Sequence, residues 1–201
     1  MVNFLKAESC KLKTVAGFTL IEMIVVISIF TIMTGVVLAN LPQFRERTAL
    51  QLVAQKISLT IREDQVYGVA FKSSSTTIFP SHGIYFYPTT GGSSNLKSYI
   101  LFADNPTSNN KYDGVAEKVT QYDLTGSVEI QKIETFNTVD LTHSEGFHLV
   151  FKRPKTEANF TDSLGSTITA SYAKITLVST RSLETRTVWV WNTGQISVKS
   201  S

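Results

Sequence analysis

The chain has 201 residues, of which 42% are hydrophobic and 17% are charged. This length suits one ordinary domain with an additional segment, and the composition excludes both a polytopic membrane protein and a disordered chain. The formal net charge of +3 falls to +1 beyond the first seventeen residues, and the basic residues are scattered, so the charge pattern predicts no nucleic-acid partner.

The N-terminal part joins a short basic segment to a long apolar one. Residues 1–17 are polar and contain three lysines, whereas the run from Phe18 to Leu41 contains a single charge. About 20 apolar residues suffice to cross a hydrocarbon core as a helix. Because the lysines precede this run, we expect a cytoplasmic N-terminus, with everything after Leu41 on the outer side of the membrane.

The single charge in the apolar run is Glu22, which lies one helical turn from its start. A carboxylate inside a membrane costs a few kcal/mol unless it is paired, so such a residue is a functional hypothesis by default. The alternative is that Glu22 lies close enough to the interface to reach water.

The sequence Gly-Phe-Thr-Leu-Ile-Glu at residues 17–22 resembles the processing site of type IV prepilins and type II secretion pseudopilins. The family pattern is a Gly, then a Phe, then a short apolar stretch with Glu at the fifth mature position, and each of these positions is matched. The resemblance implies that residues 1–17 are a leader, that a prepilin peptidase cuts after Gly17, and that Phe18 becomes N-methylated.

The resemblance also implies a role for Glu22, which would pair with the freed amine of Phe18 in a neighbouring subunit. A carboxylate and an ammonium each cost several kcal/mol to bury alone, and they offset each other when they are brought together. This pairing would set the register of subunits that otherwise pack through featureless apolar surfaces.

The function implied is structural: a minor pilin or pseudopilin of a type IV pilus, a competence pilus or a type II secretion pseudopilus, with no enzymatic activity. The expected partners are other pilin or pseudopilin subunits, the prepilin peptidase, an inner-membrane assembly platform with its ATPase, and membrane lipid around Phe18 to Leu41. The chain would cross the cytoplasmic membrane once before it enters the filament. An alternative is a tip-located minor subunit that binds DNA, a surface or a secreted substrate.

A second alternative is an ordinary secretory signal, because Val37-Leu38-Ala39 satisfies the small-residue rule of signal peptidase. Cleavage after Ala39 would release a soluble secreted β domain. Two features argue against it: the apolar run exceeds the usual length of a secretory core of about 7–15 residues, and it contains Glu22.

Beyond the apolar run the pattern predicts that the helix continues to about Tyr67. Apolar residues recur at spacings of three and four from Leu50 to Ile61, while charged residues such as Glu46 fill the other face. Gly35 and Pro42 are the candidates for the helix-perturbing residues of the family, although Pro42 comes later than is usual. Residues 49–71 resemble the stem of the H-type pseudopilin and its minor-pilin relatives.

The remainder, residues 68–201, alternates in the manner of β-strands separated by turn residues. These candidate strands are residues 76–79, 83–87, 98–102, 118–124, 127–133, 146–151, 168–178, 186–191 and 195–198. A turn at residues 192–194 predicts a C-terminal hairpin with Gly194 at positive φ. The fold class is therefore α+β, a long N-terminal helix packed on antiparallel sheets. We expect residues 73–77, 91–95 and 155–165 to be flexible.

No catalytic motif is present, and no histidine spacing favours zinc. One segment gathers oxygen ligands of the kind calcium prefers, so it is a weak candidate for a Ca²⁺ site, although the same residues also make good turns. Its candidate ligands are Asp104, Asn109, Asp113 and Glu117. No other cofactor is expected. Trp189 and Trp191 share one face of a strand, where they serve core packing, sheet-surface packing or a contact surface.

Overall fold

The computed structural model describes residues 17–70, 80–87, 96–105 and 109–200. The predicted leader up to residue 16, the predicted strand at residues 76–79 and the expected flexible segments 73–77 and 91–95 lie outside the described residues. The chain divides after Pro42 into two compact units, residues 1–42 and 43–201.

Helix α1 (Leu20–Val69) is continuous for 50 residues, with Pro42 inside it. This confirms the prediction of one long helix rather than two. In the first unit the helix is apolar on every side, and its best window has a mean hydropathy of 2.4 with no buried residue. It is long and apolar enough to cross a membrane.

Two hydroxyl groups in the apolar half, those of Ser28 and Thr31, are satisfied within the helix itself. The Ser28 hydroxyl donates to the Ile24 carbonyl at 2.8 Å, and the Thr31 hydroxyl donates to the Ile27 carbonyl at 2.8 Å. Because a hydrocarbon environment offers no partner to a polar group, these internal bonds make both residues compatible with a membrane span.

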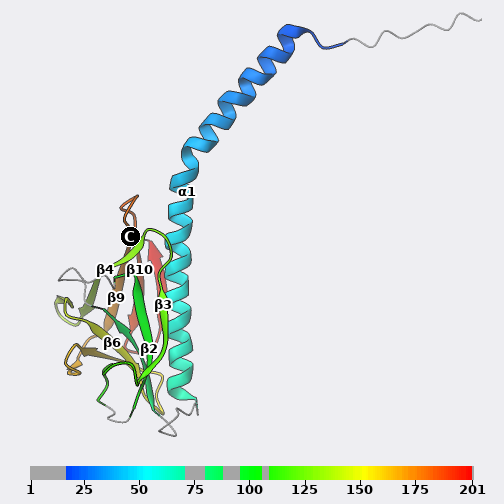
Figure 1. The fold of residues 1–201 in the computed structure, drawn as a ribbon. Helices are drawn as coiled ribbons and strands as arrows, with labels where there is room; N and C mark the ends of the chain where they lie inside the picture. Colours follow the sequence, from blue (N-terminus) through cyan, green and yellow to red (C-terminus); the bar gives the residue numbers. More distant parts are fainter. Residues whose placement is uncertain (1–16, 71–79, 88–95, 106–108, 201) are drawn as a thin grey trace, which may run out of the picture. The chain divides into compact units, whose positions relative to one another are not determined.

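The second unit contains two antiparallel sheets, against which the later part of α1 runs (Figure 1). The six-stranded sheet has the order β3-β2-β1-β6-β7-β8. Its strands are β1 (Ser81–Phe86), β2 (Ser98–Asp104), β3 (Lys118–Asp123), β6 (Phe147–Phe151), β7 (Ala158–Asp162) and β8 (Thr167–Ile168). The five-stranded sheet has the order β11-β10-β9-β4-β5. Its strands are β4 (Val128–Phe136), β5 (Asp140–Thr142), β9 (Tyr172–Ser179), β10 (Thr185–Trp191) and β11 (Ile196–Ser200).

One apolar core lies between the two sheets and one face of α1. The helix contributes the residues whose spacing predicted this face, Leu50, Val53, Ala54, Ile57 and Ile61, and all five are buried. The helix lies against β6 at Gly68, where a Cβ atom would lie 2.6 Å from the Cβ of Phe151. Only glycine fits this contact without a shift of the neighbouring strand.

Most predicted strands are confirmed, but the single strand expected at residues 168–178 is wrong. Ile168 pairs with Phe160 in the six-stranded sheet, and Tyr172 pairs with Phe136 in the five-stranded sheet. The chain therefore crosses from one sheet to the other within an apolar and β-branched run, and strand pattern alone does not mark such a crossing.

The structure also contains β5 and β7, which the sequence did not predict. Strand β7 falls in residues 155–165, which we expected to be flexible, and this expectation is wrong. Phe160 is 2% exposed and pairs with Leu149 of β6, so burial of one large side chain fixes the segment. The C-terminal hairpin is confirmed, because Trp191 donates its backbone N–H to Gln195 at 2.9 Å and Gly194 has a φ of 84°.

Candidate functional site

The first candidate site is the start of α1, where Thr19 caps the helix. The backbone N–H of Glu22 donates to the Thr19 side-chain oxygen at 3.2 Å, and the N–H of Met23 donates to the Thr19 carbonyl at 3.2 Å. Thr19 and Glu22 thus occupy the two positions of a capping-box pattern. Gly17 and Phe18 precede the helix, and both are exposed in the isolated chain.

The electrostatics of this end of the helix explain why a carboxylate suits it. The unpaired N–H groups of the first turn carry partial positive charge, and Glu22 lies in that turn. An acidic side chain in this turn is therefore stabilised by the helix backbone itself.

The surface of α1 from Leu20 to Asn40, together with Phe18, is apolar and exposed on all sides, and we name it the apolar collar. Phe18 is 77% exposed, and every described side chain from Leu20 to Asn40 is also open to solvent in the isolated chain. A soluble monomer rarely exposes so much contiguous apolar surface. The collar is therefore built to be covered by lipid or by other helices.

The acidic segment brings its four predicted ligands together, and hydrogen bonds already engage them. Buried Asp104 accepts the backbone N–H groups of Asn109 at 3.1 Å and Asn110 at 2.8 Å, one on each carboxylate oxygen. Glu117 accepts the N–H of Asp113 at 2.7 Å, and the Asn109 amide donates to Asp113 at 2.6 Å. Burial raises the pKa of both Asp104 and Glu117.

Within the part of the chain that the structure describes, no group of three His, Cys, Asp or Glu residues is placed to hold a metal ion. The carboxylates of Asp104 and Glu117 instead accept backbone N–H groups of Asn105, Asn109, Asn110 and Asp113. Calcium binding at this loop stays a prediction.

A polar anchor that the sequence did not predict ties α1 to the five-stranded sheet. Glu46 accepts hydrogen bonds from the hydroxyls of Ser127 and Ser179, the latter at 2.9 Å, and lies 3.6 Å from Arg181. These hydroxyls lower the pKa of Glu46. The next residue, Arg47, pairs with Glu184 at 2.8 Å. We expected Glu46 on a solvent-facing side, because helical periodicity does not reveal which polar residues meet a loop.

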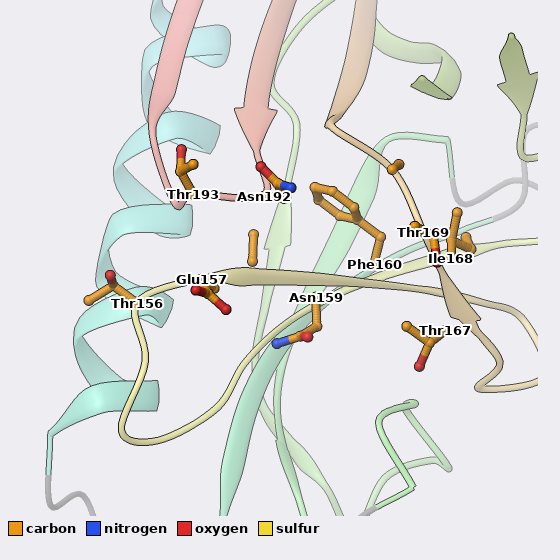
Figure 2. A pocket seen from close by; sticks show the side chains of 11 residues that line it. Thr156, Glu157, Asn159, Phe160, Thr167, Ile168, Thr169, Asn192 and Thr193 are labelled. Carbon is orange, nitrogen blue, oxygen red and sulfur yellow. The ribbon is translucent and has the colours of Figure 1, made fainter. Parts of the chain in front are cut away.

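A cavity of about 500 Å³ opens between β7, β8 and the turn that joins β10 to β11 (Figure 2). Most of its lining side chains are uncharged, among them several threonines and asparagines, and Figure 2 shows the Asn192 side chain pointing toward the Phe160 ring. Glu157 is the one ionisable residue in the lining.

The two tryptophans lie on the outer face of the five-stranded sheet. Trp189 and Trp191 are partly exposed, while their neighbours in β10, Val188 and Val190, are fully buried. Of the alternatives that the sequence left open, core packing is thereby excluded, and these rings belong to the sheet surface.

Comparison with known protein families matches residues 12–38 to the family model of the prokaryotic N-terminal methylation motif. The match covers the predicted cleavage site, Glu22 and most of the apolar collar, and it leaves the β-rich unit unmatched. No curated protein and no solved structure matches the chain.

Proposed function

Since its N-terminal methylation motif and its helix-on-sheets architecture are those of type IV pilin-like proteins, we propose that this chain is a structural subunit of a type IV pilus or a type II secretion pseudopilus. A prepilin peptidase cleaves it between Gly17 and Phe18, and the new terminus is N-methylated. The protein acts by polymerisation through α1 and catalyses no reaction.

The observation that carries this proposal is the apolar collar, which follows the Thr19 cap and contains one acid, Glu22, in the first turn of α1. Before assembly, lipid covers the collar, and the chain lies across the cytoplasmic membrane with residues 43–201 on the outer side. During assembly, an inner-membrane platform transfers the collar from lipid to the helices of neighbouring subunits. Glu22 of one subunit then meets the Phe18 amine of another.

Mass spectrometry of the exported protein tests the processing step. The expected product begins with N-methylated Phe18. A product that begins at Asn40 would instead mean cleavage by signal peptidase after Ala39 and release of a secreted β domain. That outcome, or retention of residues 1–17, would refute the proposal.

The Glu22→Ala variant tests the assembly step, with Glu145→Ala, an exposed acid in the turn before β6, as the matched control. We expect Glu22→Ala to insert into the membrane and to be processed at Gly17, but to be missing from sheared filaments. The control variant should enter filaments at the level of the unaltered chain. Normal incorporation of Glu22→Ala would contradict the proposed pairing.

A further inference from the structure

A row of four aromatic side chains crosses the outer face of the five-stranded sheet. The rings of Phe136 on β4 and Tyr172 on β9 are 5.2 Å apart, and those of Tyr172 and Trp189 are 4.7 Å apart. Trp191 continues the row at 6.0 Å from Trp189, with the two ring planes inclined by 26°. We name these four residues the aromatic row.

Lysine side chains border the Trp189 end of the row. The Lys199 ammonium lies 4.6 Å from the centre of the Trp189 ring and 5.7 Å from that of Trp191, and the Lys174 ammonium lies 5.8 Å from Trp189. Trp189 therefore has Tyr172 at one side and a cation at another. Ammonium groups at such distances are attracted by the ring.

The charges around the row are unevenly distributed. Glu134 on β4 pairs with Lys132 at 2.7 Å and with Lys174 at 3.3 Å, and Asp140 on β5 lies near Tyr172, so the acidic groups of this face gather at the Phe136 end. Lys199 on β11 has no carboxylate within ion-pair distance in the described part of the chain. The Trp189 end is thus the cationic end, and it holds the larger rings.

We propose that the Trp189 end of the aromatic row binds single-stranded nucleic acid. Proteins that bind such strands without sequence preference combine aromatic rings, on which bases stack, with basic groups that contact the phosphates. Here a phosphate would draw the Lys199 ammonium away from the Trp189 ring, and a base would take its place against that ring. Tyr172 supports the Trp189 ring from β9.

Two features favour this occupant over others. A duplex keeps its bases stacked within the helix, so it presents no free base to rings on a sheet surface. A neutral glycan could contact the rings and accept hydrogen bonds from the lysine that covers Trp189, but it has no charge to complement that ammonium. The balanced charge of the whole chain predicted no nucleic-acid partner, whereas the fold places Lys174 and Lys199, on different strands, beside one ring.

This inference goes beyond the role of a structural subunit, because binding at the row is independent of polymerisation through Glu22. The row lies wholly within residues 43–201, and binding can be measured on unassembled protein. Failure of the binding test would leave the assembly proposal intact. Failure of the Glu22 test would likewise leave the binding proposal intact.

The chain supplies its own probe, because its two tryptophans, Trp189 and Trp191, are both in the row. We would titrate the full-length chain in detergent micelles with an oligothymidylate of about 15 nucleotides, close to the upper site size for single-strand binding folds. The expected result is saturable quenching of tryptophan fluorescence that weakens as salt is raised, because phosphate contacts release counterions.

Three variants sharpen the test, with affinity measured by the polarisation of a labelled oligonucleotide. Trp189→Leu should weaken binding about tenfold, whereas Trp189→Phe, which keeps a ring, should restore most of it. Lys199→Gln should make the negative slope of log affinity against log salt concentration shallower by about 0.7, because one phosphate contact is lost. Lys118→Gln on β3 of the other sheet removes the same charge and should bind like the unaltered chain.

Absence of quenching by the oligonucleotide would overturn the proposal. So would equal quenching by a neutral oligosaccharide, which would assign the rings to glycans. Equal losses in Lys118→Gln and Lys199→Gln would mean a diffuse charge effect, and this too would overturn the assignment to the row. Circular dichroism of each variant would establish that the sheets remain folded.

Discussion

Asp64 is the residue whose replacement should reveal most about the packing of α1 on the sheets. It lies on the buried face of the helix, one turn after Ile61, and has no exposed surface. Neither of its carboxylate oxygens has a hydrogen-bond partner in the part of the chain that the structure describes. Burial, followed by the charge of Glu63, raises the pKa of Asp64 well above 3.8.

The direction of this pKa shift fixes how stability depends on pH. The folded state binds the Asp64 proton more tightly than the unfolded chain does, so folding is favoured most below the unfolded value of 3.8. The contribution is lost as pH rises from that value through the folded pKa. Asp64 should therefore make the protein more stable in acid than at higher pH.

The Asp64→Asn variant keeps the shape of the side chain and removes its titration. We expect the difference in melting temperature between the variant and the unaltered chain to move in favour of Asn as pH rises above 4. Asp64→Leu also removes the unsatisfied polar group. This should raise the free energy of unfolding by about 1–3 kcal/mol, less any cost of overpacking. For a chain of this size each kcal/mol shifts the melting temperature by about 2–4 °C.

Thermal unfolding of the full chain in detergent micelles, followed by circular dichroism between pH 4 and pH 8, measures both effects. Other carboxyl groups titrate in this range, and Asp104 and Glu117 share the direction of Asp64. Comparison of variant and unaltered chain at each pH removes their contribution. If the melting temperatures of the variant and the unaltered chain differed by the same amount at every pH, Asp64 would not be a buried group that retains its proton.

Two further predictions concern contacts of α1 with the sheets. Glu46→Gln should lower the melting temperature at neutral pH and lose this effect in acid. Hydrogen bonds from Ser127 and Ser179 lower the pKa of Glu46 below 4.5, so the stabilisation by this carboxylate is lost as pH falls through its folded pKa. Equal destabilisation at all pH values would argue against an ionised Glu46. Gly68→Ala should be destabilising in urea titrations. Overpacking against Phe151 costs about 1–3 kcal/mol, which outweighs the gain of up to about 1 kcal/mol from alanine in a helix. A more stable variant would show that β6 shifts to make room for the new methyl group.

The sequence predicted those features that arise from local pattern. The N-terminal motif is a contiguous signal that the family model also matches, at residues 12–38. The apolar run and the spacing of residues from Leu50 to Ile61 are contiguous too, and both appear in the structure where they were expected. The C-terminal hairpin was equally predictable, because Gly194 marks a turn by a backbone conformation that few other residues adopt.

The sequence could not predict features that depend on which segments meet in space. Strand β7 is fixed by burial of Phe160 against β6, and the crossing near Ala170 depends on which sheet each neighbouring strand joins. Asp64 looks like an ordinary polar residue of an amphipathic helix until its buried position is known. The aromatic row is assembled from three strands, and the lysine nearest to Trp189 comes from a fourth.

The two units of the chain differ in how their apolar side chains are removed from water. Residues 43–201 bury their own core, from Leu50 on the helix to Ile196 on β11, and need no partner to do so. Residues 20–40 bury nothing, so the free energy of covering them is available only from lipid or from other subunits. Since lipid and neighbouring helices are about equally apolar, burial alone cannot favour one over the other. A specific contact has to tip this balance, and Glu22 is the one ionisable residue of the apolar run that can provide it.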